Sequence, residues 1–216
     1  MAIYASDSGG REFKKIPPGC YFAICNMVVD LGVQETTFKR EAKQQRKVYL
    51  RWEVPSERTT FEPKDGPSKE GPMCIGATYT LSLSDKANLR RVLENWRQRP
   101  FTPEELKKFD ITAVAGKCCQ VMIQHETGAD GKTYTKVTGI MGVSAEQREK
   151  ARVAKAENPV LVYSVDEPDE VVFNQLPNWI KEKIGERVMP KPMPMAQADG
   201  VLAGGPVDDW DDPIPF

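Results

Sequence analysis

The chain has 216 residues, of which 40% are hydrophobic and 28% charged, a composition typical of a globular protein with enough chain for one core. Its formal net charge of −1 hides a division, because residues 156–216 carry 12 acidic and 4 basic side chains while residues 1–155 carry the other 19 acidic and 26 basic ones. No apolar stretch reaches the about 18 residues of a membrane-spanning helix, and no signal-peptide pattern opens the chain, so we expect a soluble, cytoplasmic protein without a membrane partner.

The first third of the chain predicts two strands and two loops. Residues 1–19 are polar and end in Pro-Pro-Gly, which indicates an irregular lead-in. Residues 20–32 are rich in aromatic and β-branched side chains, as strands are, and the polar residues 32–45 predict a loop. KVYLRWEV (47–54) alternates with period two, which predicts a half-buried strand that ends at Pro55. Residues 55–73 hold four prolines and two glycines and predict a long mobile loop.

The middle of the chain predicts three more strands and one helix. Residues 76–84 alternate again, and a helical stripe follows over residues 84–99, with Ser84 as its N-cap and Pro100 after its end. Residues 102–106 indicate one further helical turn. Residues 117–126 and 132–143 read as strands joined by the turn TGADG, which makes a hairpin. The aromatic residues Trp52, Tyr79 and Trp96 share faces with aliphatic residues and are assigned to the core.

Five strands with one helix between the third and the fourth is the chain order of an OB-fold, a partly open Greek-key barrel. The predicted fold is therefore mainly β: an OB-fold barrel over residues 20–143 with additional C-terminal elements. Residues 144–185 are expected to be an extension docked on the barrel. Residues 186–216, with six prolines, three glycines and scattered apolar residues, are expected to be a disordered linker with an acidic tip.

Basic and aromatic residues gather where an OB-fold binds its ligand, across the second and third strands and beside the loops that follow the first and fourth strands. Cations that follow phosphates and rings that stack on bases suit single-stranded nucleic acid. The alternatives are that the charged loop is only solvated and that Tyr49 packs under a neighbouring segment. The candidate DNA-binding residues are Lys39, Arg40, Lys43, Arg46, Lys47, Tyr49 and Arg51, with Lys132, Tyr134 and Lys136 on the fifth strand.

The sequence offers no catalytic or metal-binding motif. Neither HExxH, GxSxG nor a phosphate-binding GxxxxGKS/T occurs, and the carboxylates of the body are scattered. The single histidine, His125, lacks the ligand set that zinc requires. The five cysteines show no CxxC spacing, so we expect reduced thiols rather than a disulfide framework. We therefore expect a binding protein without enzymatic activity, metal or cofactor.

The C-terminal DDWDDPIPF resembles the acidic tip of bacterial single-stranded DNA-binding proteins, which end in several aspartates followed by Ile-Pro-Phe. Trp210 and Pro213 interrupt the usual run. In that family a barrel binds DNA and the tip docks on replication and repair proteins. The resemblance therefore implies a partner-binding tip made of Asp208, Asp209, Trp210, Asp211, Asp212, Ile214, Pro215 and Phe216.

The body, through TYTLSLSDKANLRRVLENWRQRPFTPEEL and FDITAVAGKCCQVMIQHE, is similar to bacteriophage-encoded proteins regarded as single-stranded DNA-binding proteins. That resemblance spans roughly residues 20–143 and implies a phage protein acting in the cytoplasm of a bacterial host. The expected function is binding and protection of single-stranded DNA during replication, recombination or repair, with recruitment of partner proteins by the tip. The alternatives are an adaptor that mainly binds proteins and a metal-dependent nuclease. A homo-oligomer such as a dimer stays open, because one barrel holds little DNA and no apolar stripe marks an interface.

Overall fold

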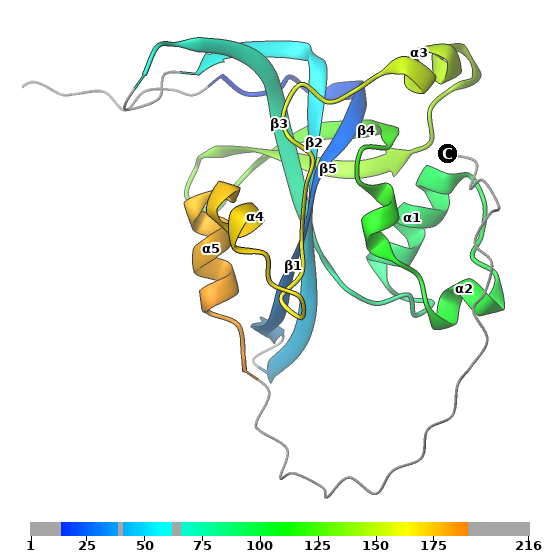
Figure 1. Ribbon diagram of the computed structural model, residues 1–216, viewed down its shortest axis with the longest axis vertical. Coiled ribbons are helices and arrows are strands. Elements are labelled where there is room, and N and C mark those ends of the chain that lie inside the picture. The colour runs from blue at the N-terminus through cyan, green and yellow to red at the C-terminus, as the bar shows by residue number, and fades with distance from the viewer. Residues whose placement is uncertain (1–13, 39–40, 62–65, 190–216) are drawn as a thin grey trace, which may run out of the picture.

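The computed structural model describes residues 14–38, 41–61 and 66–189, and its centre is a curled antiparallel sheet (Figure 1). Five strands lie in the order β3-β2-β1-β4-β5, and a short sixth strand pairs with β1 in parallel. The edge strands β3 and β5 approach each other without being hydrogen-bonded neighbours, so the sheet is an open half-barrel. The elements are β1 (Gly19–Phe38), β2 (Glu41–Phe61), β3 (Lys69–Thr80), α1 (Asn88–Arg97), α2 (Pro103–Lys107), a 3-10 turn (Ile111–Val114), β4 (Cys118–Thr127), β5 (Thr133–Met141), a second 3-10 turn (Ala145–Gln147), α3 (Arg148–Val153), β6 (Leu161–Tyr163), α4 (Glu170–Gln175) and α5 (Asn178–Gly185).

Irregular pairing bends the strands. The register of β1 with β2 shifts between Cys25 and Met27 and again between Asp30 and Gly32. An extra residue on one strand of a pair bends that strand and increases its twist, which helps a sheet to curl. Gly32 has a φ of 71°, a conformation that glycine adopts without the steric cost that other residues meet.

The inner face of the half-barrel holds the main core. Trp52 is fully buried, and its ring lies 6.1 Å from that of Trp96, which α1 contributes from the other side. The indole nitrogen of Trp96 donates a hydrogen bond to the carbonyl of Cys118 at 2.8 Å and so ties α1 to β4. The predicted alternation of β2 and the predicted helical stripe are both confirmed, as is the assignment of three aromatic residues to the core. The buried residues of the main core include Val48, Leu50, Trp52, Val54, Leu89, Val92, Leu93 and Trp96, with Tyr79 packed against them.

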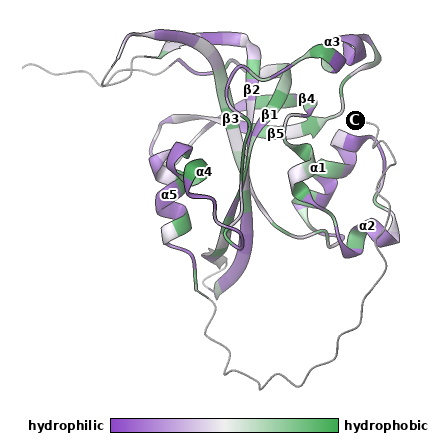
Figure 2. Ribbon diagram, in the orientation of Figure 1, coloured by the Kyte–Doolittle hydropathy of each residue, from purple (hydrophilic) through white to green (hydrophobic). Residues whose placement is uncertain are grey.

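The two predicted loops are wrong over most of their length, because β1, β2 and β3 extend into them. Residues 33–38 of β1 pair with residues 41–46 of β2, and residues 58–61 of β2 pair with residues 69–72 of β3. Figure 2 shows the far end of the β1–β2 hairpin in the hydrophilic colour, which is why the sequence there shows no alternation. Pro55 does not end β2, because it lies in a register shift between Val54 and Arg58, where its missing N–H interrupts no ladder bond.

The helix also begins later than predicted. α1 starts at Asn88 after Ala87, which provides no side-chain cap. Ser84, the predicted cap, instead hydrogen-bonds to Ser82 in the connection that follows β3. Gln98 adopts a left-handed conformation with a φ of 56° and ends the helix before Pro100.

The C-terminal elements cover the outer face of β1 and β2. In Figure 1 α4 and α5 lie on one side of the long strands and α1 and α2 on the other. Together with the outward side chains of β1, these elements form a second buried cluster, which keeps that face of the sheet from solvent. Its members are Met27, Val29, Leu31, Tyr49, Leu161, Tyr163, Leu176, Ile180 and Ile184.

A buried carboxylate fastens the chain ahead of β6. Glu53 of β2 is fully buried and accepts hydrogen bonds from the backbone N–H groups of Glu157 at 2.8 Å and Asn158 at 3.1 Å. Its Oε2 also accepts from the side-chain amides of Asn158 at 2.9 Å and Asn26 at 3.2 Å. Four donors thus converge on one carboxylate and hold the turn at residues 157–158 against the sheet.

Within the described part of the chain, no helix combines the length and the apolar character needed to cross a bilayer. All five cysteines lie in this part and are free thiols, as predicted. Cys118 is half-buried and Cys119 is fully buried in the main core, so the two neighbours face opposite sides of β4.

Candidate nucleic-acid interface

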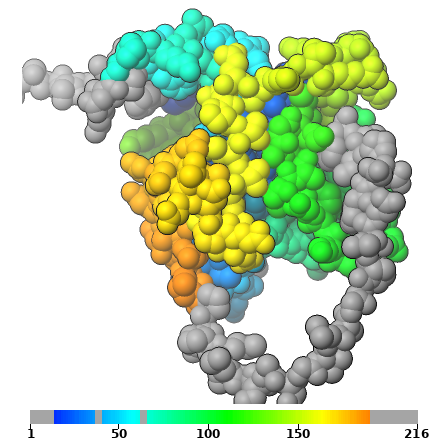
Figure 3. All heavy atoms as spheres, viewed as in Figure 1, coloured from blue at the N-terminus to red at the C-terminus, as the bar shows by residue number. Residues whose placement is uncertain are grey.

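Tyr49, a candidate DNA-binding residue, does not present its ring to solvent, and the alternative that it packs under a neighbouring segment is confirmed. The residue is 9% exposed, and Trp179 of α5 packs against its ring edge-to-face with the centroids 4.9 Å apart. Gly76 of β3 lies so close that a Cβ built there would be 2.0 Å from the Tyr49 hydroxyl. Burial raises the pKa of Tyr49 to about 12. In Figure 3 the residues of the C-terminal extension fill the centre of the visible face, which is the physical reason for the correction.

The two arginines of the predicted β2 site are engaged within the protein. Arg46 forms ion pairs with Asp30 of β1 and with Asp166, and its Nε donates to Asp30 at 3.1 Å. Its hydrogen bond to Asp30 is the main cause that raises its pKa. The Nε of Arg51 donates to Asn26 at 3.0 Å. These guanidinium groups therefore stabilise the sheet and its cover.

The remaining residues of the basic hairpin fall into two groups. Lys43 is exposed on β2 near the far end of the hairpin. Lys39 and Arg40 lie outside the described residues, as does the whole predicted tip over residues 208–216.

The fifth strand keeps an exposed aromatic side chain, as predicted. Tyr134 is 51% exposed, and its hydroxyl donates to Asp130 at 2.6 Å, which fixes the ring against Gly128. Lys132 and Lys136 are also exposed, and Lys136 forms an ion pair with Glu126 at 2.6 Å. Figure 1 places the β4–β5 turn away from the far end of the β1–β2 hairpin, so the two predicted ligand loops do not meet.

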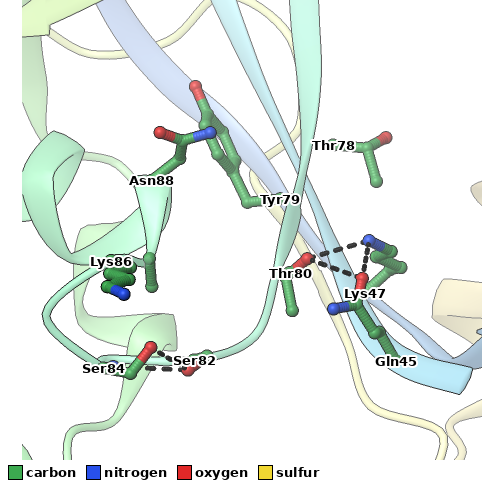
Figure 4. A pocket seen from close by; sticks show the side chains of 10 residues that line it. Gln45, Lys47, Thr78, Tyr79, Thr80, Ser82, Ser84, Lys86 and Asn88 are labelled. Atoms are coloured by element: carbon green, nitrogen blue, oxygen red, sulfur yellow. Dashed lines mark hydrogen bonds between the residues drawn. The ribbon is translucent and has the colours of Figure 1, made fainter. Parts of the chain in front are cut away.

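A pocket of about 420 Å³ brings Lys47 together with residues that the sequence did not single out for binding. It lies where β2, β3 and the β3–α1 connection meet. Figure 4 shows Lys47 beside Gln45 and Thr80 at one end and Lys86 on the connection at the other. The lining residues are Gln45, Lys47, Thr78, Tyr79, Thr80, Ser82, Ser84, Lys86, Ala87 and Asn88.

The pocket is cationic and rich in hydroxyl groups. Its lining contains two lysines and no aspartate or glutamate, and the neighbouring Asp85 is ion-paired to Arg90. The ammonium group of Lys47 donates to Gln45 Oε1 at 2.9 Å and to Thr80 Oγ1 at 2.8 Å. Partial burial lowers the pKa of Lys47, because desolvation disfavours its charged form. Such a lining suits an anionic ligand.

Tyr79 has a double position, since its ring packs on the main core and also lines this pocket. Burial raises the pKa of its hydroxyl to about 12. Alternation along β3 predicted the core contact. No sequence signal predicted the pocket, because its other wall comes from the irregular connection that carries Ser82, Ser84 and Lys86.

The structure offers no clustered metal ligands among the residues it describes. The ring nitrogen Nε2 of His125 lies 2.8 Å from the carbonyl oxygen of Ile16, so this side chain holds the lead-in segment against β4. Cys119, which precedes His125 on β4, is buried in the main core.

No family model matches the chain, and the comparisons with curated proteins and with solved structures found no match.

Proposed function

We propose that the protein binds single-stranded DNA without strong sequence preference through its half-barrel, and recruits partner proteins through its C-terminal tip. The observation that carries the proposal is the pocket on β2 and β3, whose lining has two lysines, four hydroxyl side chains and an aromatic ring but no acid. Cations and an aromatic ring on these strands are what a protein needs to hold a sugar–phosphate backbone and its bases.

An OB-fold is the architecture that we propose for the half-barrel. The strand order β3-β2-β1-β4-β5, the approach of β3 to β5 and the position of α1 between β3 and β4 along the chain all support it. OB-folds bind single strands across β2 and β3. Because the C-terminal elements cover the middle of the outer face here, the path that we propose avoids Tyr49 and runs over the lysine pocket, with Tyr134 of β5 as a second contact.

The acidic C-terminal part of the chain and the sequence of its tip support the proposed recruitment of partner proteins. The tip DDWDDPIPF, through Asp208, Asp209, Trp210, Asp211, Asp212, Ile214, Pro215 and Phe216, combines four aspartates with two aromatic side chains. Acidic motifs are captured by clusters of arginine, a recurring mode of peptide recognition. We propose partners that act in DNA replication, recombination or repair, and a phage protein acting in its host's cytoplasm, on the resemblance of tip and body.

Binding of labelled oligo-dT and of duplex DNA at two salt concentrations tests the proposal. Each phosphate contact to a single strand contributes a slope of about −0.7, so a fourfold rise in salt lowers affinity about 2.6-fold per contact. Oligo-dT should bind more tightly than duplex and lose affinity with salt. Absence of oligo-dT binding together with retained partner binding would favour a protein adaptor instead, and metal-dependent cleavage of the oligonucleotide would favour a nuclease.

Tyr134→Ala and Tyr49→Phe are a matched pair of variants that tests whether DNA contacts the exposed ring on β5. Tyr134→Ala removes a stacking surface worth about 1–3 kcal/mol per base, so oligo-dT affinity should fall about 5- to 150-fold. Tyr49→Phe removes only a covered hydroxyl and should leave the affinity unchanged. An equal loss in both variants would contradict the proposed path.

Removal of residues 208–216 tests the tip. The truncated protein should lose partner binding, and it should bind oligo-dT more tightly at low salt, because four aspartates no longer compete with DNA for the cations. Unchanged or weaker DNA binding would refute the competition and leave recruitment as the role of the tip.

A further inference from the structure

Lys47 is a partly buried cation whose hydrogen-bond partners are neutral. Its ammonium group contacts the amide oxygen of Gln45 and the hydroxyl of Thr80, and neither supplies a negative charge. By contrast, the neighbouring Arg46 has two carboxylate partners. Partial removal of a charge from water is unfavourable unless an opposite charge compensates for it. Two of the three ammonium N–H groups of Lys47 thus have neutral acceptors and its charge has no counter-charge, which is the condition that an anion relieves.

The lining of the pocket specifies the kind of anion. Thr80 donates its hydroxyl to Gln45 at 3.3 Å and Ser82 donates to Ser84 at 3.2 Å. The hydroxyl groups of Thr78 and Ser84 can donate to phosphate oxygens, and no carboxylate of the lining would repel them. The volume of about 420 Å³ falls within the range of about 300–1,000 Å³ that is typical of ligand pockets. A phosphate group with its attached sugar therefore fits in both size and chemistry.

The two lysines stand at opposite ends of the pocket, with the end of β3 between them and the ring of Tyr79 extending to one side beside Asn88 (Figure 4). A single compact anion held by Lys47 leaves Lys86 without a role. A chain of phosphates satisfies both cations at once, because successive phosphates of a strand are separated by a sugar. The half-buried ring of Tyr79 lies where that sugar or its base would pass.

We infer that this pocket binds two successive phosphates of one nucleic-acid strand, with Lys47 as the fixed cation for the first and Lys86 as the mobile cation for the second. The inference rests on the proposed single-strand binding and names the part of the strand that the pocket recognises. Recognition is by the backbone and independent of base identity. A dinucleotide with a 5′-phosphate carries two successive phosphates and so engages both lysines.

Titration calorimetry on the full-length chain tests the inference with three probes: thymidine, thymidine 5′-monophosphate and the 5′-phosphorylated dinucleotide d(pTpT). We expect no binding of thymidine, weak binding of the monophosphate and tighter binding of the dinucleotide. Lys47→Gln should weaken both phosphorylated probes about 10-fold or more, because it removes a charge-assisted hydrogen bond. Lys86→Gln should weaken the dinucleotide about 2- to 5-fold and leave the monophosphate unchanged, because Lys86 is exposed and contacts only the second phosphate.

Lys155→Gln is the matched control, since it removes one positive charge from an exposed position that does not line the pocket. It should leave both phosphorylated probes unchanged, and the thermal unfolding curves of all variants should match that of the wild type. In oligo-dT binding, Lys47→Gln should also reduce the magnitude of the salt slope by about 0.7. If Lys47→Gln destabilises the protein, the test rests on Lys86→Gln alone. This variant should weaken binding of the dinucleotide but not of the monophosphate, and that difference does not depend on the buried end of the pocket.

The outcomes separate this inference from the proposed function. Oligo-dT binding that neither Lys47→Gln nor Lys86→Gln weakens would overturn the inference and leave the function intact. Binding of the monophosphate by a protein that does not bind oligo-dT would overturn both the function and the two-phosphate assignment. Equal binding of thymidine and its monophosphate would overturn recognition of phosphate.

Discussion

The buried carboxylate of Glu53 allows a quantitative test of how the C-terminal extension is held. Glu53→Ala removes the acceptor of four hydrogen bonds, two from the backbone at residues 157 and 158 and two from the side chains of Asn158 and Asn26. Asn26 is fully buried, so bulk water cannot replace the acceptor that its side-chain amide loses. Leaving this donor without the carboxylate costs about 1–3 kcal/mol. Glu157 is exposed and Asn158 half-buried, so water can replace part of what the turn loses.

We therefore expect Glu53→Ala to lower the free energy of unfolding by about 3 kcal/mol. For a protein of this size each kcal/mol shifts the melting temperature by about 2–4 °C, so the expected decrease is about 6–12 °C. Glu53→Gln keeps the volume and one acceptor oxygen but turns an N–H donor toward the N–H of Glu157. Its cost should be smaller, about 1–2 kcal/mol.

Thermal and urea unfolding followed by circular dichroism measure both variants. Glu146→Ala, at an exposed position, is the control and should stay within about 0.5 kcal/mol of the wild type. Hydrogen exchange should show faster exchange at the amides of Glu157 and Asn158 in the alanine variant. A Glu53→Ala protein as stable as the control, with unchanged exchange at those two amides, would refute the argument that this carboxylate fastens the turn.

Two further predictions concern packing and pH. Gly76→Ala should destabilise the protein by about 1–3 kcal/mol in urea unfolding, because the new Cβ would overlap the ring and hydroxyl of Tyr49. Gly185→Ala is the control and should be near neutral, because the space around its Cβ is open. Equal stability of the two variants would contradict the close approach of Gly76 to Tyr49. Desolvation raises the pKa of Glu105, but hydrogen bonds from two arginines and a backbone N–H outweigh it and lower the pKa to about 2. A lowered carboxyl pKa adds stability above its unfolded value of 4.5 that is lost as pH falls toward 2. The stability difference between wild type and Glu105→Gln in urea unfolding should therefore shrink over that interval, and a constant difference would contradict the prediction.

Sequence patterns predicted the elements that have one buried face. Alternation in β2 and the three-and-four spacing in α1 reflect the main core directly, so Leu50, Trp52 and Trp96 are buried as expected. The two hairpin extensions escaped prediction because they protrude beyond the core and are polar on both faces. Backbone pairing and polar cross-strand contacts such as the Arg58–Glu70 ion pair hold them, and neither requires alternating apolar side chains.

The sequence predicted that the candidate site contains basic residues, but it did not predict which of their side chains are free to bind a ligand. A run of basic residues indicates cations, but their partners lie on other strands and in the extension: Asp30 and Asp166 neutralise Arg46. Period two also places Tyr49 opposite the main core without revealing that α5 covers it. Lys47 was expected at the site, whereas Lys86 joins it only because the β3–α1 connection folds back toward β2.

The C-terminal elements that cover the outer face must be kept in any fragment of this chain that is produced in isolation. A fragment that stopped after β5 would leave Met27, Val29 and Tyr49 facing water as one apolar strip on a sheet whose β1 edge lacks its β6 partner. Exposed apolar strips beside an open strand edge promote aggregation. Expression trials and crystallisation should therefore use a fragment that continues at least through Val188, whose backbone N–H still bonds to the carbonyl of Val33.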